Sequence, residues 1–235
     1  IKEIKQTTMS FKEFTKELNG SRVEGELIKT ILYSLLTSFI LLGILYYVKL
    51  KTISDFVPKY GFFIFFASLS VALIIPAMRQ VRAYKQLPCM SGMMIGMTVG
   101  MISGFLIGFL IGATNGMFIG GVAGMAMGIV MGIYTGNCCG IMGAMEGIMA
   151  GFMGGIMGAM TSVMLLNDNL KAATIIVYIV SAIIMISLNY MIYKESRDIE
   201  RVKNEDYMLD IFITMIIISF VTWIMLYGPR SFLFG

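Results

Sequence analysis

The chain has 235 residues, of which 57% are hydrophobic and only 14% are charged, and its mean hydropathy is +0.83. These values lie far from those of soluble proteins and indicate an integral membrane protein. The formal net charge of +4 comes from Lys and Arg in short polar segments, so no nucleic-acid partner is expected. The absence of histidine excludes a conventional His-based zinc or haem site.

The N-terminal segment, residues 1–28, is polar and carries both signs of charge. Ser10 and Glu13 match a capping box, and Phe11, Phe14 and Leu18 follow at helical spacing. This pattern predicts either a short helix on the membrane surface or a soluble helical arm.

Seven apolar stretches follow, each of roughly 20 residues and therefore long enough to cross a bilayer. They are residues 29–49, 57–78, 89–112, 117–135, 139–165, 172–193 and 208–227. We predict an all-α polytopic membrane helix bundle of about seven transmembrane helices with a glycine-zipper core. Its expected regions are the N-terminal segment (1–28), a helical hairpin (29–78), a basic loop (79–88), a Gly/Met-rich three-helix core (89–165) and two C-terminal helices with their loop (166–235).

A glycine occupies every fourth position from Gly92 to Gly140, and the row slips by three to Gly143 before it resumes. Those 49 residues would form a helix about 73 Å long, more than twice the ~30 Å hydrocarbon core. The row must therefore fold back, and turns are predicted at residues 113–116 and 135–137. In lipid, small residues let helix backbones approach closely. The glycines expected at helix contacts are Gly92, Gly96, Gly100, Gly104, Gly108, Gly124, Gly128, Gly132, Gly147, Gly151 and Gly155.

The distribution of Lys and Arg predicts the orientation. With seven spans, 13 of the 18 cationic residues fall on one side, in the N-terminal segment and in the loops after the second and sixth spans. We therefore expect a cell-membrane protein with its N-terminus in the cytoplasm and its C-terminus outside.

Seven of the 23 methionines form two ladders at four-residue spacing, one of Met93, Met97 and Met101 and one of Met145, Met149, Met153 and Met157. This spacing places each ladder on one helix face. The cysteines precede these ladders in the sequence, and on the predicted orientation they lie at the cytoplasmic end. Thioether and thiolate sulfur are ligands that suit Cu(I). The candidate metal ligands are Cys89, Met93, Met97, Met101, Cys138, Cys139, Met142, Met145, Met149, Met153 and Met157. The alternative is that methionine fills gaps beside the glycines.

Two short motifs resemble those of metal transporters. Met93 and Met97 together with Gly92 and Gly96 resemble the pore elements of the Ctr copper transporters, and the adjacent Cys138 and Cys139 are similar to the pair in Mer-type mercuric-ion transporters. Ctr subunits have three spans, so the resemblance implies shared soft-metal chemistry and no family membership.

Glu146 is the only charged residue between Gln86 and Asn167. A carboxylate within a membrane span usually marks a functional site or a satisfied polar network. It is a candidate for ion binding or proton coupling, and the alternative is that it bonds a backbone carbonyl beside a glycine.

These features predict a membrane transport protein, a channel or secondary carrier, for a soft monovalent metal ion such as Cu(I) or Ag(I). No resident cofactor and no enzymatic activity are expected. The alternative function is a non-transporting glycine-zipper scaffold or accessory subunit. The expected partners are the lipid bilayer and, for the alternative function, copies of the chain or another membrane protein.

Overall fold

The computed structural model describes residues 26–48, 56–83, 89–196 and 207–229, and each element in these ranges is a helix. The long helices are α2 (Glu26–Val48), α3 (Phe56–Ala83), α4 (Cys89–Asn115), α5 (Met117–Gly136), α6 (Ile141–Met164), α7 (Leu170–Ser196) and α8 (Tyr207–Tyr227). Two short 3-10 helices, η3 (Asn137–Cys139) and η4 (Leu165–Asn167), lie on either side of α6. The capping-box helix predicted near Ser10 lies outside the described residues.

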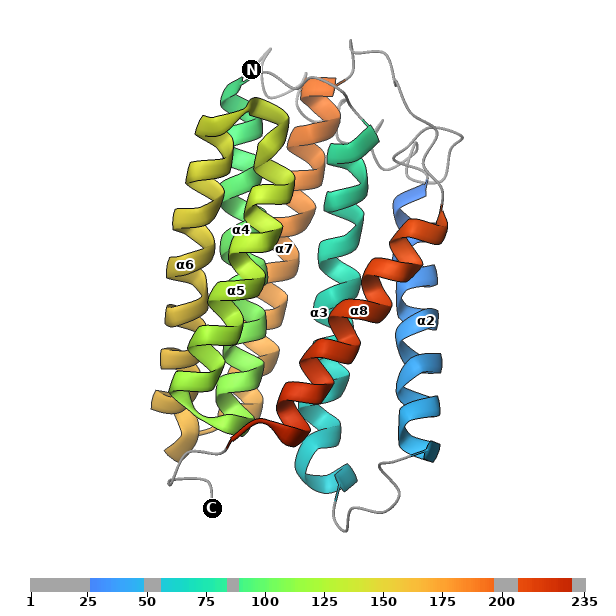
Figure 1. The fold of residues 1–235 in the computed structure, drawn as a ribbon, viewed down its shortest axis with the longest axis vertical. Helices are drawn as coiled ribbons and strands as arrows, with labels where there is room; N and C mark the ends of the chain where they lie inside the picture. Colours follow the sequence, from blue (N-terminus) through green and yellow to red (C-terminus); the bar gives the residue numbers. More distant parts are fainter. Residues whose placement is uncertain (1–25, 49–55, 84–88, 197–206, 230–235) are drawn as a thin grey trace, which may run out of the picture.

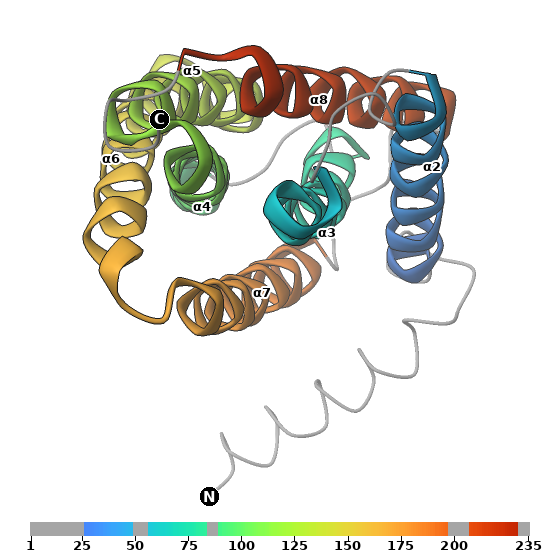
Figure 2. The same ribbon diagram turned by 90° about the horizontal axis from the view of Figure 1, so that it is seen from below.

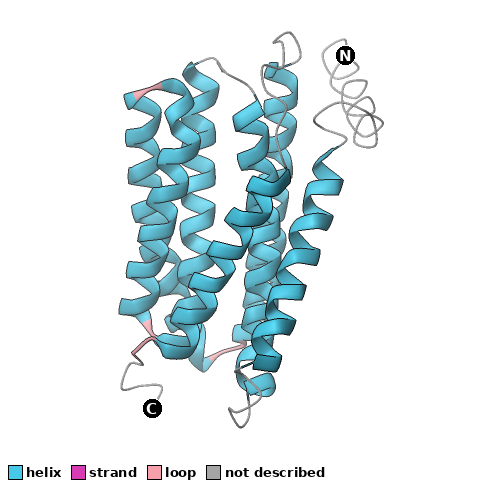
Figure 3. Ribbon diagram, turned by 45° about the vertical axis from the view of Figure 1, so that its right-hand side comes forward, coloured by secondary structure: helices cyan, strands magenta, loops and turns pink. Residues whose placement is uncertain are grey.

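Among the described residues, six helical segments are long and apolar enough to cross a membrane: Tyr60–Arg82, Cys89–Asn115, Met117–Cys139, Ile141–Asn167, Leu170–Ile192 and Met208–Tyr227. The apolar stretch of α2, Lys29–Ile44, is shorter. Successive helices run in alternating directions along one common axis (Figures 1 and 3). The predicted all-α membrane helix bundle is confirmed.

The helix ends differ from the predicted spans at two places. The first turn of the glycine row falls at Asn115–Gly116 as predicted, where Gly116 has φ 105°. The second turn comes later than predicted, because α5 continues to Gly136 and the positive-φ residue is Gly140. Helix α3 also continues to Ala83, so Arg79 and Arg82 lie on a helix, whereas the sequence analysis placed them in a loop.

Glycines from α4, α5 and α6 meet in groups of three at successive levels of the bundle. A Cβ atom built on Gly100 would lie 2.9 Å from the carbonyl oxygen of Gly147 and 3.1 Å from Cα of Gly132. Real Cβ atoms essentially never show the first distance, and the second is tighter than most of their contacts, so the three backbones are in contact. The groups that approach in this way are Gly96–Gly136–Gly143, Gly100–Gly132–Gly147, Gly104–Gly128–Gly151, Gly108–Gly124–Gly155 and Gly112–Gly120–Ala159.

These groups, which we call the glycine layers, explain the spacing of the row. Each helix advances by four residues, about 6 Å, from one layer to the next. Helices α4 and α6 run in the same direction and α5 runs opposite, so a residue of α4 is level with the α6 residue 47 positions later, as Gly100 is with Gly147. The slip of three after Gly140 sets this register, because the turn between α5 and α6 occupies those positions.

Helix α4 lies between the glycine layers and the rest of the bundle (Figure 2). Its other face carries large buried side chains, among them Ile95, Val99 and Phe109. These side chains belong to one hydrophobic cluster with Ile75 of α3 and Val221 of α8. The bundle therefore combines backbone contact on one side of α4 with side-chain packing on the other.

Asn115 connects the end of α4 to α8. Its side chain is 1% exposed, and its Nδ2 donates hydrogen bonds to the carbonyl oxygens of Ile224 (2.9 Å) and Gly228 (3.2 Å). Thr114 Oγ1 donates to Asn115 Oδ1 at 2.8 Å. The Ile224 carbonyl also accepts a hydrogen bond from the Gly228 N–H at 2.8 Å, whereas the Gly228 carbonyl lies beyond the helix end, where intrahelical donors are lacking and a membrane offers few others. Asn115 therefore satisfies the end of α8 while it begins the turn to α5.

The glycine layers predict opposite outcomes for two alanine substitutions on α5. In Gly128→Ala the new Cβ would lie 2.8 Å from the Gly151 carbonyl oxygen, whereas in Gly121→Ala the nearest atom would be 3.9 Å away. We expect Gly128→Ala to lower the free energy of unfolding by about 1–3 kcal/mol through overpacking. Gly121→Ala should change it by less than about 1 kcal/mol. Reversible unfolding in detergent micelles measures both, and equal losses would contradict the close contact at Gly128.

Candidate functional site

The two adjacent cysteines close the glycine layers at one end of the bundle. Cys138 and Cys139 lie in η3, and their Sγ atoms are 3.7 Å apart. The Cys139 thiol occupies the space over Gly92, where a Cβ on residue 92 would overlap its Sγ and would lie 3.0 Å from Cys138 Sγ. Cys138 Sγ also donates a hydrogen bond to the Thr135 carbonyl oxygen at 3.3 Å. The missing side chain at Gly92 thus makes room for a thiol.

Cys89 belongs to the same end, because it is the first residue of α4 and lies one turn before Gly92. All three cysteines are described, and none of them forms a disulfide. In the described part of the chain no three His, Cys, Asp or Glu side chains are grouped to hold a metal ion. A site with three or more ligands at this end would therefore need thioether sulfur as well as the thiols.

The methionine ladders lie on the outside of the three-helix core. On α4, Met97 and Met101 are exposed and Met93 is half-buried. On α6 the exposed members are Met142, Met145, Met149, Met153 and Met157. The glycine layers fill the space between the helices, so the ladders do not line an interior channel between α4, α5 and α6. Helices α4 and α6 approach closely beside the α4 ladder, where Gly154 of α6 packs against the backbone of Met101.

Glu146 is exposed on α6. By the register of the glycine layers it is level with Val99, and therefore lies between the levels of Met97 and Met101 on α4. The described structure assigns no hydrogen bond or ion pair to its carboxylate. Its position, about two turns into a membrane span, keeps it a candidate for ion or proton coupling.

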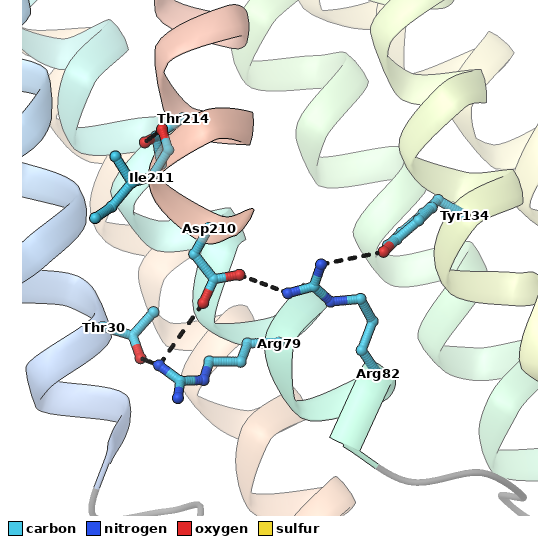
Figure 4. Close-up of polar contacts among 7 residues, drawn as sticks. All are labelled: Thr30, Arg79, Arg82, Tyr134, Asp210, Ile211 and Thr214. Carbon is cyan, nitrogen blue, oxygen red and sulfur yellow. Dashed lines mark hydrogen bonds and ion pairs between the residues drawn. The ribbon is translucent and has the colours of Figure 1, made fainter. Parts of the chain in front are cut away.

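A cluster of charged residues that the sequence analysis did not identify joins four helices near the thiol end. Arg82 of α3 donates to Asp210 of α8, with Nη2 and Oδ1 2.6 Å apart, and to the hydroxyl of Tyr134 on α5 at 3.3 Å. Arg79 donates to Thr30 of α2 at 2.9 Å and lies 3.7 Å from Asp210 Oδ2. Figure 4 shows both guanidinium groups directed at the one carboxylate.

Burial makes this cluster important for stability. Arg79 is 2% exposed and Asp210 is 7% exposed. A buried guanidinium is tolerated only beside an opposite charge and hydrogen-bond acceptors. One feature of the sequence indicated a buried ion pair: Asp210 is an acid inside an apolar span, and such residues usually have a charged or polar partner. The sequence could not show that Asp210 pairs with Arg82, because the two residues are 128 positions apart.

Asp210→Asn should destabilise the protein more than Arg82→Gln. The asparagine variant removes the carboxylate that both the buried Arg79 and the partly buried Arg82 approach, and loss of one partner of a buried pair costs about 3–5 kcal/mol. The glutamine variant keeps the carboxylate of Asp210 beside Arg79, so the loss should be smaller. Unfolding of both variants in detergent gives the comparison, and a larger loss for Arg82→Gln would contradict the role assigned to Asp210.

Comparisons with protein-family models, curated proteins and solved structures gave no match to this chain.

Proposed function

We propose that this integral membrane protein binds and transports a soft monovalent metal ion, Cu(I) or Ag(I), as a channel or secondary carrier. The observation that carries the proposal is the pair of thiols 3.7 Å apart, seated on Gly92 beside the start of α4. Two sulfur atoms this close can bind one soft ion together, and thiolate sulfur selects Cu(I) over Mg²⁺ or Ca²⁺.

The proposed route runs from the thiols along the outer faces of α4 and α6. The α6 ladder from Met145 to Met157 covers about 18 Å of a membrane crossing. Weak ligands at short intervals suit conduction, because an ion must bind well enough to enter and loosely enough to leave. Glu146, at the level of the α4 ladder, is the proposed residue for coupling or for balancing the charge of the ion.

A scaffold or accessory subunit is the second candidate, and the glycine layers favour it. The contact of three backbones leaves no passage inside the α4–α5–α6 core, and a rigid core of this kind suits a protein that holds other membrane segments in place. The two candidates differ in one measurable property, because only the transporter needs the thiols to bind metal.

Silver binding by the purified, reduced protein tests the proposal. We expect the full chain to retain Ag(I) after loading and desalting, and to retain neither Zn²⁺ nor Mg²⁺. Replacing Cys138 and Cys139 by serine should abolish retention. Gly92→Ala should weaken silver affinity by about 10-fold to 100-fold, the range typical when a residue that orients a metal ligand is changed, because the new methyl group displaces the Cys139 thiol.

Gly121→Ala is the matched control, since it adds the same methyl group to the core without a close contact and should leave silver affinity unchanged. Elemental analysis of the desalted protein measures the retained metal, and titration with Ag(I) against a competing thiol ligand measures the affinities. A wild-type protein that retains no silver would contradict the metal proposal and leave the scaffold.

The proposed orientation places the thiols and the Arg79–Asp210 cluster in the cytoplasm, since 13 of the 18 Lys and Arg residues fall on that side. Asn167 and Lys194 lie near opposite ends of α7. In a background without native cysteines, Lys194→Cys should react with a membrane-impermeant thiol reagent only from the cytoplasmic side and Asn167→Cys only from outside. Labelling of both from one side would contradict the topology.

A further inference from the structure

The buried side of α2 consists of hydroxyl residues. Of the α2 side chains that the structure describes, only Thr30, Ser34 and Ser38 are buried, and their four-residue spacing places them on one helix face. We call these three residues the hydroxyl stripe. Helix α2 packs against α3 and α8 at the edge of the bundle (Figures 1 and 2). Close contact alone would be served by glycine, as in the glycine layers, so the hydroxyl groups need another explanation.

Ser34 is the member of the stripe that points to a ligand. It is 3% exposed, and within the described part of the chain its Oγ has no hydrogen-bond partner. Ser38 differs, because its Oγ donates to the carbonyl oxygen of Ser34 at 2.6 Å. A buried hydroxyl that gains no partner loses its hydrogen bonds to water without compensation. Such groups are rare in folded proteins and call for a functional reason or an ordered water molecule.

The spacing of the stripe suits a chain of water molecules. Successive hydroxyl residues lie about 6 Å apart along α2, which is about twice the ~2.8 Å length of an O–H···O hydrogen bond. One water molecule can therefore bridge each pair. A hydroxyl oxygen has two acceptor lone pairs, so Thr30, which accepts a hydrogen bond from Arg79 at 2.9 Å, can still accept one from water.

We propose that α2 moves apart from α3 and α8 to open a water-filled crevice lined by the hydroxyl stripe, and that the bond from Arg79 to Thr30 holds its mouth closed. In the closed arrangement of Figure 4 the stripe is buried and Arg79 lies between Thr30 of α2 and Asp210 of α8. Helix α8 adds a further hydroxyl, since Thr214 is buried one turn beyond Asp210. When α2 moves away, water gives Ser34 the hydrogen bonds that it lacks in the closed arrangement.

The crevice is separate from the methionine ladders, because α2 and α6 lie on opposite sides of the bundle (Figure 2). A secondary carrier needs a driving ion that reaches the membrane interior, and buried acids in membrane spans mark such pathways. The crevice offers a path of this kind past Asp210. This use rests on the proposed function, whereas the crevice itself rests on Ser34 and on the buried stripe.

Cysteine accessibility tests the crevice, because only the thiolate is nucleophilic and a thiolate needs water. In a background with Cys89, Cys138 and Cys139 replaced by serine, Ser34→Cys should be labelled by a charged methanethiosulfonate reagent in membrane fragments open on both sides. Leu36→Cys is the matched control, because Leu36 lies two residues further along α2 and is 59% exposed. Outside the crevice it faces lipid and should stay unlabelled.

Labelling of both cysteines after unfolding in detergent shows that each thiol is present. A Ser34→Cys protein that stays unlabelled in membranes would overturn the crevice and leave a dry packing contact. Equal labelling at both positions would also overturn it, because the reagent would then reach this depth without a crevice.

Thr30→Val tests the closing bond, because valine keeps the shape of threonine and cannot accept a hydrogen bond from Arg79. We expect it to speed the labelling of Ser34→Cys by about threefold to twentyfold, the range typical for the loss of one hydrogen bond between membrane helices. An unchanged or slower rate would overturn the role given to this bond. Neither test involves metal, so a failed crevice leaves the metal proposal standing, and a protein that retains no silver leaves the crevice standing.

Discussion

Contact between bare backbones in the glycine layers is the constraint on which the rest of this structure depends. In the four layers made of three glycines, α4, α5 and α6 approach so closely that a single methyl group would crowd or overlap a neighbouring peptide. In water such a helix would be penalised, since each glycine costs about 1 kcal/mol relative to alanine. In lipid the backbone has no competing partner, so the close approach is retained. The turn between α5 and α6 must therefore have the length that aligns the glycines of α6 with those of α4 and α5.

A core filled by backbone leaves the chemistry to its ends and its outer faces. At the thiol end, Gly92 is the first glycine of α4 in the row, and the Cys139 thiol takes the place that a third backbone fills in the other layers. On the outside, methionines alternate with the inward glycines along α6, as Met149 and Met153 do with Gly147 and Gly151. The sulfur ligands and the packing residues thus belong to one repeating pattern, which is why the sequence alone could not separate their roles.

The parts of the fold that could be predicted are those set by local pattern. The period-four row, the length limit of a bilayer and the Asn115–Gly116 pair together implied three short-linked antiparallel helices. The Arg79–Asp210 cluster could not be predicted, because pairing across 128 residues depends on how α3 and α8 pack. The end of α3 was misplaced for the same reason. Two arginines inside an apolar bundle are stable only beside an opposite charge, and the sequence did not show that Asp210 lies next to them. The outward direction of the methionine ladders could not be predicted either, because it depends on which faces of α4 and α6 the glycine layers bring into contact.

The rigid core and the surrounding helices are joined by polar contacts at both ends of α5. At the thiol end Tyr134 accepts a hydrogen bond from Arg82, and at the other end Asn115 holds the last carbonyl groups of α8. Between these points α4 packs on α3 and α8 through apolar side chains, which have no directional preference and permit small sliding. A displacement of the core relative to α8 must therefore strain the bonds of Asn115 or the Arg82 bridge to Asp210. Tyr134 lies four residues, about one helical turn, before Cys138, so the thiols and the Arg82 bridge to Asp210 lie at the same end of the bundle.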